Sequence, residues 1–240
     1  MSQNPYEAPY VPFGNVAAQA AVDERATFIR KTYLHLLGAI LAFAAIDAVA
    51  LTLFNEQIGQ FAATVTSGYT WLLFLGAFMG VSYIADRWAH SDTSRSMQYT
   101  GLSLYVVAQA VLFLPLLYVA DRFAPGAISS AGIVTAVVFG GLTFVVFFTK
   151  ADFSFLRSAL VVGGFAAIGL IVASIFLGFQ LGMWFSVAMI LMAAGSILYS
   201  TSNVLHSYRT SQYVAASLSL FASVALLFWY VLRLFMAFDE

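Results

Sequence analysis

Two rows of hydroxyl and amide side chains near the C-terminus are the residues best arranged for chemistry in this sequence. The spacings are four, three and four residues in the first row and seven, four and seven in the second, so each row marks one helix face. Such groups can solvate a passing cation, or they can join two helices by hydrogen bonds. The members are Ser196, Ser200, Asn203 and Ser207 in the first row, and Gln212, Ser219, Ser223 and Tyr230 in the second.

Asp47 is a second candidate, because an ionisable side chain at membrane depth is costly and therefore often functional. It lies about fifteen residues into the first apolar segment, which is about 22 Å along a helix. One interpretation is a proton or cation ligand. The alternative is a structural carboxylate that is hydrogen-bonded to neighbouring helices or lies near the outer interface. Arg233 is the candidate partner, unless its side chain extends to the lipid headgroups.

Most classes of catalysis lack the residues they require. The chain has no cysteine. His35, His90 and His206 fall at the ends of apolar segments without the spacing of a metal site. Lys31 and Lys150, the two lysines, also lie at segment ends, where neither can carry a retinal Schiff base. The sequence predicts that the chain is not an enzyme and that it has no metal and no cofactor.

The composition dictates the elements that position these residues. Of 240 residues, 62% are hydrophobic and 9% are charged, whereas soluble proteins have about 45–50% and about 25%. Seven apolar segments are each long enough, or nearly so, to cross a bilayer. We therefore expect an all-α, polytopic membrane protein with seven transmembrane helices. The segments lie near residues 32–54, 69–85, 97–119, 130–148, 156–178, 183–205 and 212–235.

The charges predict the orientation. Eight of the ten basic residues fall at segment ends on one side of the membrane, which the positive-inside rule assigns to the cytosol. The sequence thus predicts a flexible cytosolic tail over residues 1–24, a transmembrane domain over 25–240, and a C-terminus outside. The basic residues of the cytosolic side are Arg25, Arg30, Lys31, Arg87, Arg95, Lys150, Arg157 and Arg209, and those of the other side are Arg122 and Arg233.

Small residues are expected where helices pack. Gly76 and Gly80 form a GxxxG pattern, and Gly140-Gly141 and Gly163-Gly164 are pairs. Close approach of two helix backbones is the usual role of such residues in membranes. The alternative is that they line a pore.

Several segments together resemble the Bax inhibitor-1 family. The similarity extends from about residue 24 to the C-terminus and is carried by five stretches. They are 24–33 (ERATFIRKTY), 101–117 with its GLS and PLL, 131–139 (AGIVTAVVF), 150–156 (KADFSFL) and 197–206 (ILYSTSNVLH).

The resemblance implies a last helix that is central and is wrapped by the other six. For calcium-conducting members it also implies a pH-sensitive leak, gated by two aspartates that share a proton and latched by a basic residue. By position these aspartates fall on Ser200 and Ser223, and the basic residue falls on Arg87. Two hydroxyls cannot share a titrating proton near neutral pH, so the place is retained and the switch is absent.

We therefore expect a bacterial inner-membrane protein that is a passive cation leak, or a regulator of one, with calcium as the implied ion. Ser200, Ser223 and Asn203 would lie along the path, with Asp47 as an outer carboxylate. The alternative is a non-conducting interaction protein that modulates membrane protein quality control or a membrane protease through its N-terminal tail. A solute carrier would need a repeat that is not present. The scattered basic residues do not indicate nucleic acid.

Overall fold

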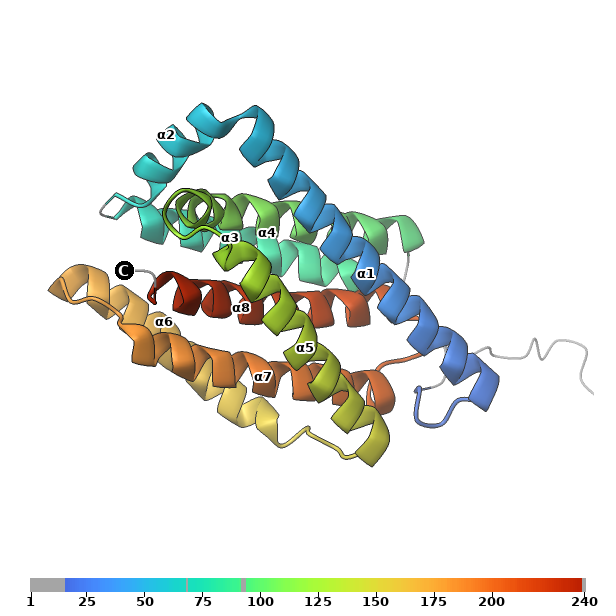
Figure 1. The fold of residues 1–240 in the computed structure, drawn as a ribbon. Coiled ribbons are helices and arrows are strands. Elements are labelled where there is room, and N and C mark those ends of the chain that lie inside the picture. Colours follow the sequence, from blue (N-terminus) through green and yellow to red (C-terminus); the bar gives the residue numbers. More distant parts are fainter. Residues whose placement is uncertain (1–15, 68, 92–93, 239–240) are drawn as a thin grey trace, which may run out of the picture.

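Each predicted apolar segment forms one helix in the computed structural model, which describes residues 16–67, 69–91 and 94–238 (Figure 1). Residues 1–15 of the predicted tail lie outside the described residues. The helices of the described chain are α1 (Val22–Leu53), α2 (Asn55–Val65), α3 (Thr70–Ala89), α4 (Arg95–Phe123), α5 (Ala127–Thr149), α6 (Leu156–Leu177), α7 (Met183–His206) and α8 (Tyr213–Met236).

The bundle is an all-α, polytopic membrane fold. Six of the described helices are long and apolar enough to cross a membrane: α1, α4, α5, α6, α7 and α8. The short helix α2 and the helix α3 together make a further candidate span that is bent by 103°. The number seven therefore stays a prediction, and α2 is an element that the apolar pattern did not indicate.

The last helix is central, as the resemblance implied. It packs against α1, α3, α4, α5 and α7, and 72% of its most apolar stretch is buried, against 6% for α6. In Figure 1, α8 lies between α4 and α7 while α1 and α5 cross it. The helix can be buried on all sides because its residues are apolar or small around the whole circumference.

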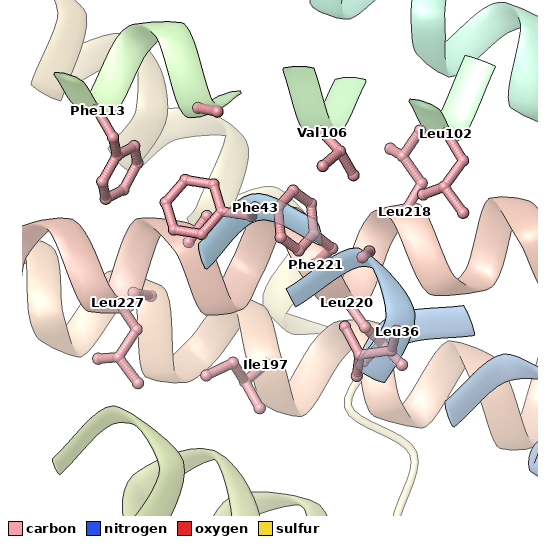
Figure 2. Packing of buried hydrophobic residues seen from close by; sticks show 14 of the residues in the cluster. Leu36, Phe43, Leu102, Val106, Phe113, Ile197, Leu218, Leu220, Phe221 and Leu227 are labelled. Atoms are coloured by element: carbon pink, nitrogen blue, oxygen red, sulfur yellow. The ribbon is translucent and has the colours of Figure 1, made fainter. Parts of the chain in front are cut away.

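Aromatic rings hold α1, α4 and α8 together (Figure 2). The Phe43 ring lies edge-on to Phe113 at 5.0 Å and to Phe221 at 5.9 Å between centroids, which is a favoured geometry for aromatic pairs. Lipid does not drive these helices together as water would, so close ring packing of this kind supplies much of the cohesion.

The glycine pattern was misleading about helix packing. A Cβ atom added at Gly76, Gly80 or Gly140 would meet no atom within 4 Å. One at Gly163 would meet only the flexible Met192 side chain. The close approach is instead at Gly101, where α4 packs so tightly on α3 that a Cβ atom would lie 2.5 Å from a backbone oxygen.

The two ends of the bundle differ in charge. We call the end with Arg25, Arg30, Lys31, Arg87, Arg95, Lys150, Arg157 and Arg209 the basic end, and the other the opposite end. At the basic end, the segment before α1 is bound to the α7–α8 turn, where the Ala17 amide donates to the Tyr208 carbonyl at 2.9 Å. Residues 16–21 of the predicted tail are thus attached to the bundle.

Candidate functional site

Four serines from the two predicted polar rows meet between α7 and α8. The Ser223 hydroxyl oxygen lies 2.8 Å from that of Ser196 and 3.2 Å from that of Ser200. Ser200 in turn lies 3.1 Å from the Ser219 hydroxyl, and Ser223 donates to the Ser219 carbonyl at 3.0 Å. The prediction that the two rows face each other is confirmed for these residues, which we call the serine cluster.

The serine cluster lines a cavity of about 1600 Å³ that is bounded by α3, α4, α6, α7 and α8. At the basic end the cavity reaches Asp86, Arg157 and Tyr208. At the opposite end it reaches Gln180 and Arg233. The cavity therefore extends along most of α8. The serine cluster lies in the part nearer the basic end, and charged groups lie towards both ends.

The basic-end mouth carries groups that the sequence did not single out. The Asp86 carboxylate is about half exposed and lies 3.4 Å from the His90 ring. Burial raises the pKa of Tyr208 to about 12, so this phenol stays neutral at physiological pH. A carboxylate at a helix end gives no signal in the sequence that a cavity opens beside it.

In the described chain the Arg87 side chain has no hydrogen bond to the serine cluster. Its guanidinium donates to the Tyr83 hydroxyl at 3.3 Å, one turn back on the same helix. Among the described residues that line the cavity, Arg87 does not occur, whereas the neighbouring Asp86 does. With hydroxyls in place of acids, the cluster offers Arg87 no carboxylate to bind.

Asn203 belongs to the predicted row but not to the cavity wall. Its side-chain oxygen accepts a hydrogen bond from Ser207 at 3.3 Å, and it is not among the described residues around the cavity. Asn203 lies in the last turn of α7 and Ser207 directly follows the helix, so the last members of the row lie at the basic end. Asn203 is thus outside the cavity wall within the described chain, and its place on an ion path stays a prediction.

Asp47 and Arg233 are not partners. Asp47 is 3% exposed, and neither carboxylate oxygen has a hydrogen-bond partner among the described residues. It faces the packed core from α1 and is not on the cavity wall. Arg233 does line the cavity, and it donates to the Leu181 carbonyl at 2.8 Å. The expected hydrogen bonds of Asp47 to neighbouring helices are therefore absent within the described chain.

The 150–156 stretch has a structural task. Lys150 ends α5 with a positive φ of 52°, and the Asp152 carboxylate accepts from the Ser154 amide at 2.8 Å in a tight turn. This hydrogen bond lowers the pKa of Asp152. Ser202 of α7 accepts from the Phe153 amide at 3.0 Å and so fixes the loop to the bundle.

Comparison with known proteins agrees with this architecture. The family model described as inhibitor of apoptosis-promoting Bax1 matches residues 25–240. The chain belongs to the Bax inhibitor-1 family. Within that family, Ser200 and Ser223 occupy the positions where the resemblance placed the two aspartates, and the structure brings them to 3.2 Å of each other.

Bacterial and viral relatives cover nearly the whole of this Bax inhibitor-1 family protein. It is 30% identical to the Pseudomonas aeruginosa protein PA2604 over 91% of this chain and 93% of the relative. It is 29% identical to the modulator of FtsH protease YccA of Escherichia coli, over 82% of this chain and 83% of the relative. It is 27% identical to a Golgi anti-apoptotic protein of vaccinia virus, over 92% and 90%.

Proposed function

We propose that this protein provides a passive cation pathway along the cavity beside α8, in a bacterial inner membrane with the basic end in the cytosol. The observation that carries the proposal is the serine cluster, four hydroxyl groups linked by hydrogen bonds on the wall of a cavity that nearly follows the length of α8. Oxygen ligands replace part of the hydration shell of a hard cation, and calcium is the candidate ion.

The charges at the ends of the cavity favour slow conduction. Asp86 supplies a negative group at the basic end, which raises the local cation concentration. Arg233 places a positive group at the opposite end, which repels the cation and so slows its passage there. We therefore propose a weak leak rather than an efficient channel.

The proposed leak has little dependence on pH between 6 and 8. Serine hydroxyls do not titrate in this range, and Tyr208 stays neutral because its pKa is raised by burial. His90 is the titratable group beside Asp86, but it lies at an exposed mouth where water and salt screen its charge. A charge at this mouth therefore modulates the flux without acting as a switch.

The test compares two double variants in proteoliposomes loaded with a calcium indicator. Ser200→Ala with Ser223→Ala removes two hydroxyls from the cavity, and we expect at least about a five-fold loss of calcium influx, from about 1 kcal/mol for a lost hydrogen-bonding group. The matched control is Thr201→Val with Ser217→Ala, which removes one buried hydroxyl each from α7 and α8 outside the cavity wall. Equal influx in both variants would reject the pathway.

A second function is favoured by one specific observation, the similarity to the modulator of FtsH protease YccA. In this alternative the protein conducts no ion and modulates a membrane protease, with the N-terminal tail as the contact. Deletion of residues 2–15 separates the two functions. A leak survives the deletion, whereas a tail-dependent effect on the degradation of a membrane substrate by reconstituted FtsH is lost.

A further inference from the structure

A group of cationic and aromatic side chains gathers where α1, α4 and α8 meet at the basic end. The Lys31 ammonium lies 5.3 Å from the centre of the Tyr213 ring, and the Arg95 guanidinium lies 4.9 Å from it. The ring itself is buried, at 8% exposed, whereas both cationic residues are exposed. Two positive groups are thus held beside one fixed ring at the membrane surface.

Two more side chains add hydrogen-bonding groups at the same level. The hydroxyls of Tyr99 and Tyr213 lie 3.0 Å apart. The His35 ring stacks on Tyr99, with its Nε2 atom 3.3 Å from the Tyr99 hydroxyl. Its Nδ1 atom donates to the Lys31 carbonyl at 2.7 Å, which fixes the ring against the helix. We call Lys31, His35, Arg95, Tyr99 and Tyr213 the cationic pocket.

The positive charge of the cationic pocket is not balanced within the described chain. Within the described chain, the ion pair found joins His90 to Asp86, outside the pocket. Neither Lys31 nor Arg95 pairs with a carboxylate of the described residues. Arg95 donates from a single nitrogen to Gln98 and to the Ser211 carbonyl, and both acceptors are neutral. Two like charges beside the same ring repel each other, so binding of an anion at this surface is favoured.

The surface next to the pocket is apolar and continues along α1 into the membrane. Positions 31, 34, 38 and 41 are three or four residues apart and form one row of the helix. Leu34 and Leu41 in this row are 58% and 60% exposed, and a Cβ atom at Gly38 would meet nothing within 4 Å. A charged group followed by an open apolar track matches a phospholipid that stands with its headgroup at the basic end.

We propose that the cationic pocket binds the phosphate of an anionic phospholipid whose acyl chain lies along the Leu34–Gly38–Leu41 row. The class of lipid follows from the net charge of its headgroup. A phosphate diester with no cation of its own gains from both Lys31 and Arg95, whereas a choline headgroup brings a third positive charge. The site is separate from the cavity beside α8, so this inference stands whether or not the protein conducts ions.

The test is native mass spectrometry of the full chain, titrated with dioleoylphosphatidylglycerol, with dioleoylphosphatidylcholine, and with inorganic phosphate. Lys31→Gln is expected to weaken phosphatidylglycerol binding about five-fold, from about 1 kcal/mol per basic residue near an anionic surface. Lys31→Arg, which keeps the positive charge, should bind phosphatidylglycerol as the unmodified protein does. The matched control Arg30→Gln removes the same charge one residue away, about 100° around the helix, and leaves binding unchanged. The thermal midpoint in neutral detergent verifies that the variants are folded.

Three results would overturn the proposal. Equal losses in Lys31→Gln and Arg30→Gln would mean diffuse attraction instead of a site. Equal binding of phosphatidylcholine would remove the role of net charge. Binding of inorganic phosphate as tight as that of the lipid would assign the pocket to free phosphate, since the apolar row would then contribute nothing. In support, Gly38→Phe, which fills the row, should weaken lipid binding and leave phosphate binding unchanged.

Discussion

Replacing Ser200 and Ser223 by aspartate should convert this protein into an acid-sensitive one. Their hydroxyl oxygens are 3.2 Å apart, so the variant Ser200→Asp with Ser223→Asp places two carboxyl groups about 4 Å apart. At that separation and an effective dielectric constant of about 20, ionising both costs about 4 kcal/mol. This corresponds to about three pH units between loss of the first and of the second proton. From an ordinary aspartate near pH 4, the second proton leaves near pH 7.

The consequence is a change in calcium flux within the physiological range. Below pH 7 the two carboxyl groups share a proton and are joined by a hydrogen bond, as close acids are. Above pH 7 both are charged and offer oxygen ligands to calcium. We expect flux into proteoliposomes to change steeply, by at least about ten-fold, between pH 6 and 8, whereas the unmodified protein stays nearly flat.

The single variants Ser200→Asp and Ser223→Asp are the controls. Each has one carboxyl group beside hydroxyls, so neither can share a proton, and neither should switch near pH 7. A flat profile in the folded double variant would refute the reasoning. It would mean that α7 and α8 are not held as closely as the serine cluster indicates, or that the cavity is not the path.

Three further outcomes follow from the same structure. Arg233→Gln should raise cation flux about ten-fold, because a positive charge about 6 Å from a passing ion costs roughly 1–3 kcal/mol; Arg122→Gln, at the same end but off the cavity wall, should not. Asp47→Leu should leave calcium flux unchanged. It should raise the thermal midpoint of unfolding, since it removes a buried carboxyl that has no partner in the described chain. A loss of flux would place Asp47 in the path. Gly101→Ala should lower the free energy of unfolding by about 1–3 kcal/mol through overpacking, because its Cβ would lie within 2.6 Å of two backbone atoms of α3. Gly140→Ala, where the added Cβ meets open space, should not lower it. Equal thermal midpoints of unfolding for the two variants would contradict the close packing.

The helices could be predicted from the sequence because lipid leaves few alternatives. A chain with few charges must satisfy its backbone groups within helices, so the apolar segments mark the spans and the polar breaks mark the turns. The eleven residues of α2 were missed for the same reason, since Asn55, Glu56, Gln57 and Gln60 make this stretch look like a polar connection. Its buried face, at Ile58, Ala62 and Val65, is too short to be distinguished from a loop.

The candidate site was only partly predictable. Spacing places Ser196, Ser200, Ser219 and Ser223 on facing helices, because two consecutive antiparallel helices align their polar faces. Spacing does not say where along the helix a cavity begins and ends, so it could not show that Asn203 lies outside the cavity wall. The basic-end mouth of the cavity, with Asp86, was missed. Its position depends on how α3 lies against α8, which no local pattern in the sequence encodes.

The same limit applies to Asp47 and the glycines. A deep carboxylate implies a partner on energetic grounds. Asp47 is buried on the same face of α1 as Phe43, and the described chain provides it with no hydrogen-bond partner. Gly76 and Gly80 have the spacing of a helix contact, but α3 turns that face away from the rest of the bundle. Which face of a helix meets a neighbour depends on the packing of the whole bundle.

The most direct test of the central claim is calcium influx into proteoliposomes that contain the unmodified protein, measured from pH 6 to pH 8. The account predicts influx above that of protein-free liposomes, varying by no more than a few-fold over this range. A steep pH dependence would contradict the assignment of hydroxyl groups to the gating positions. Influx no greater than that of protein-free liposomes would contradict the pathway itself.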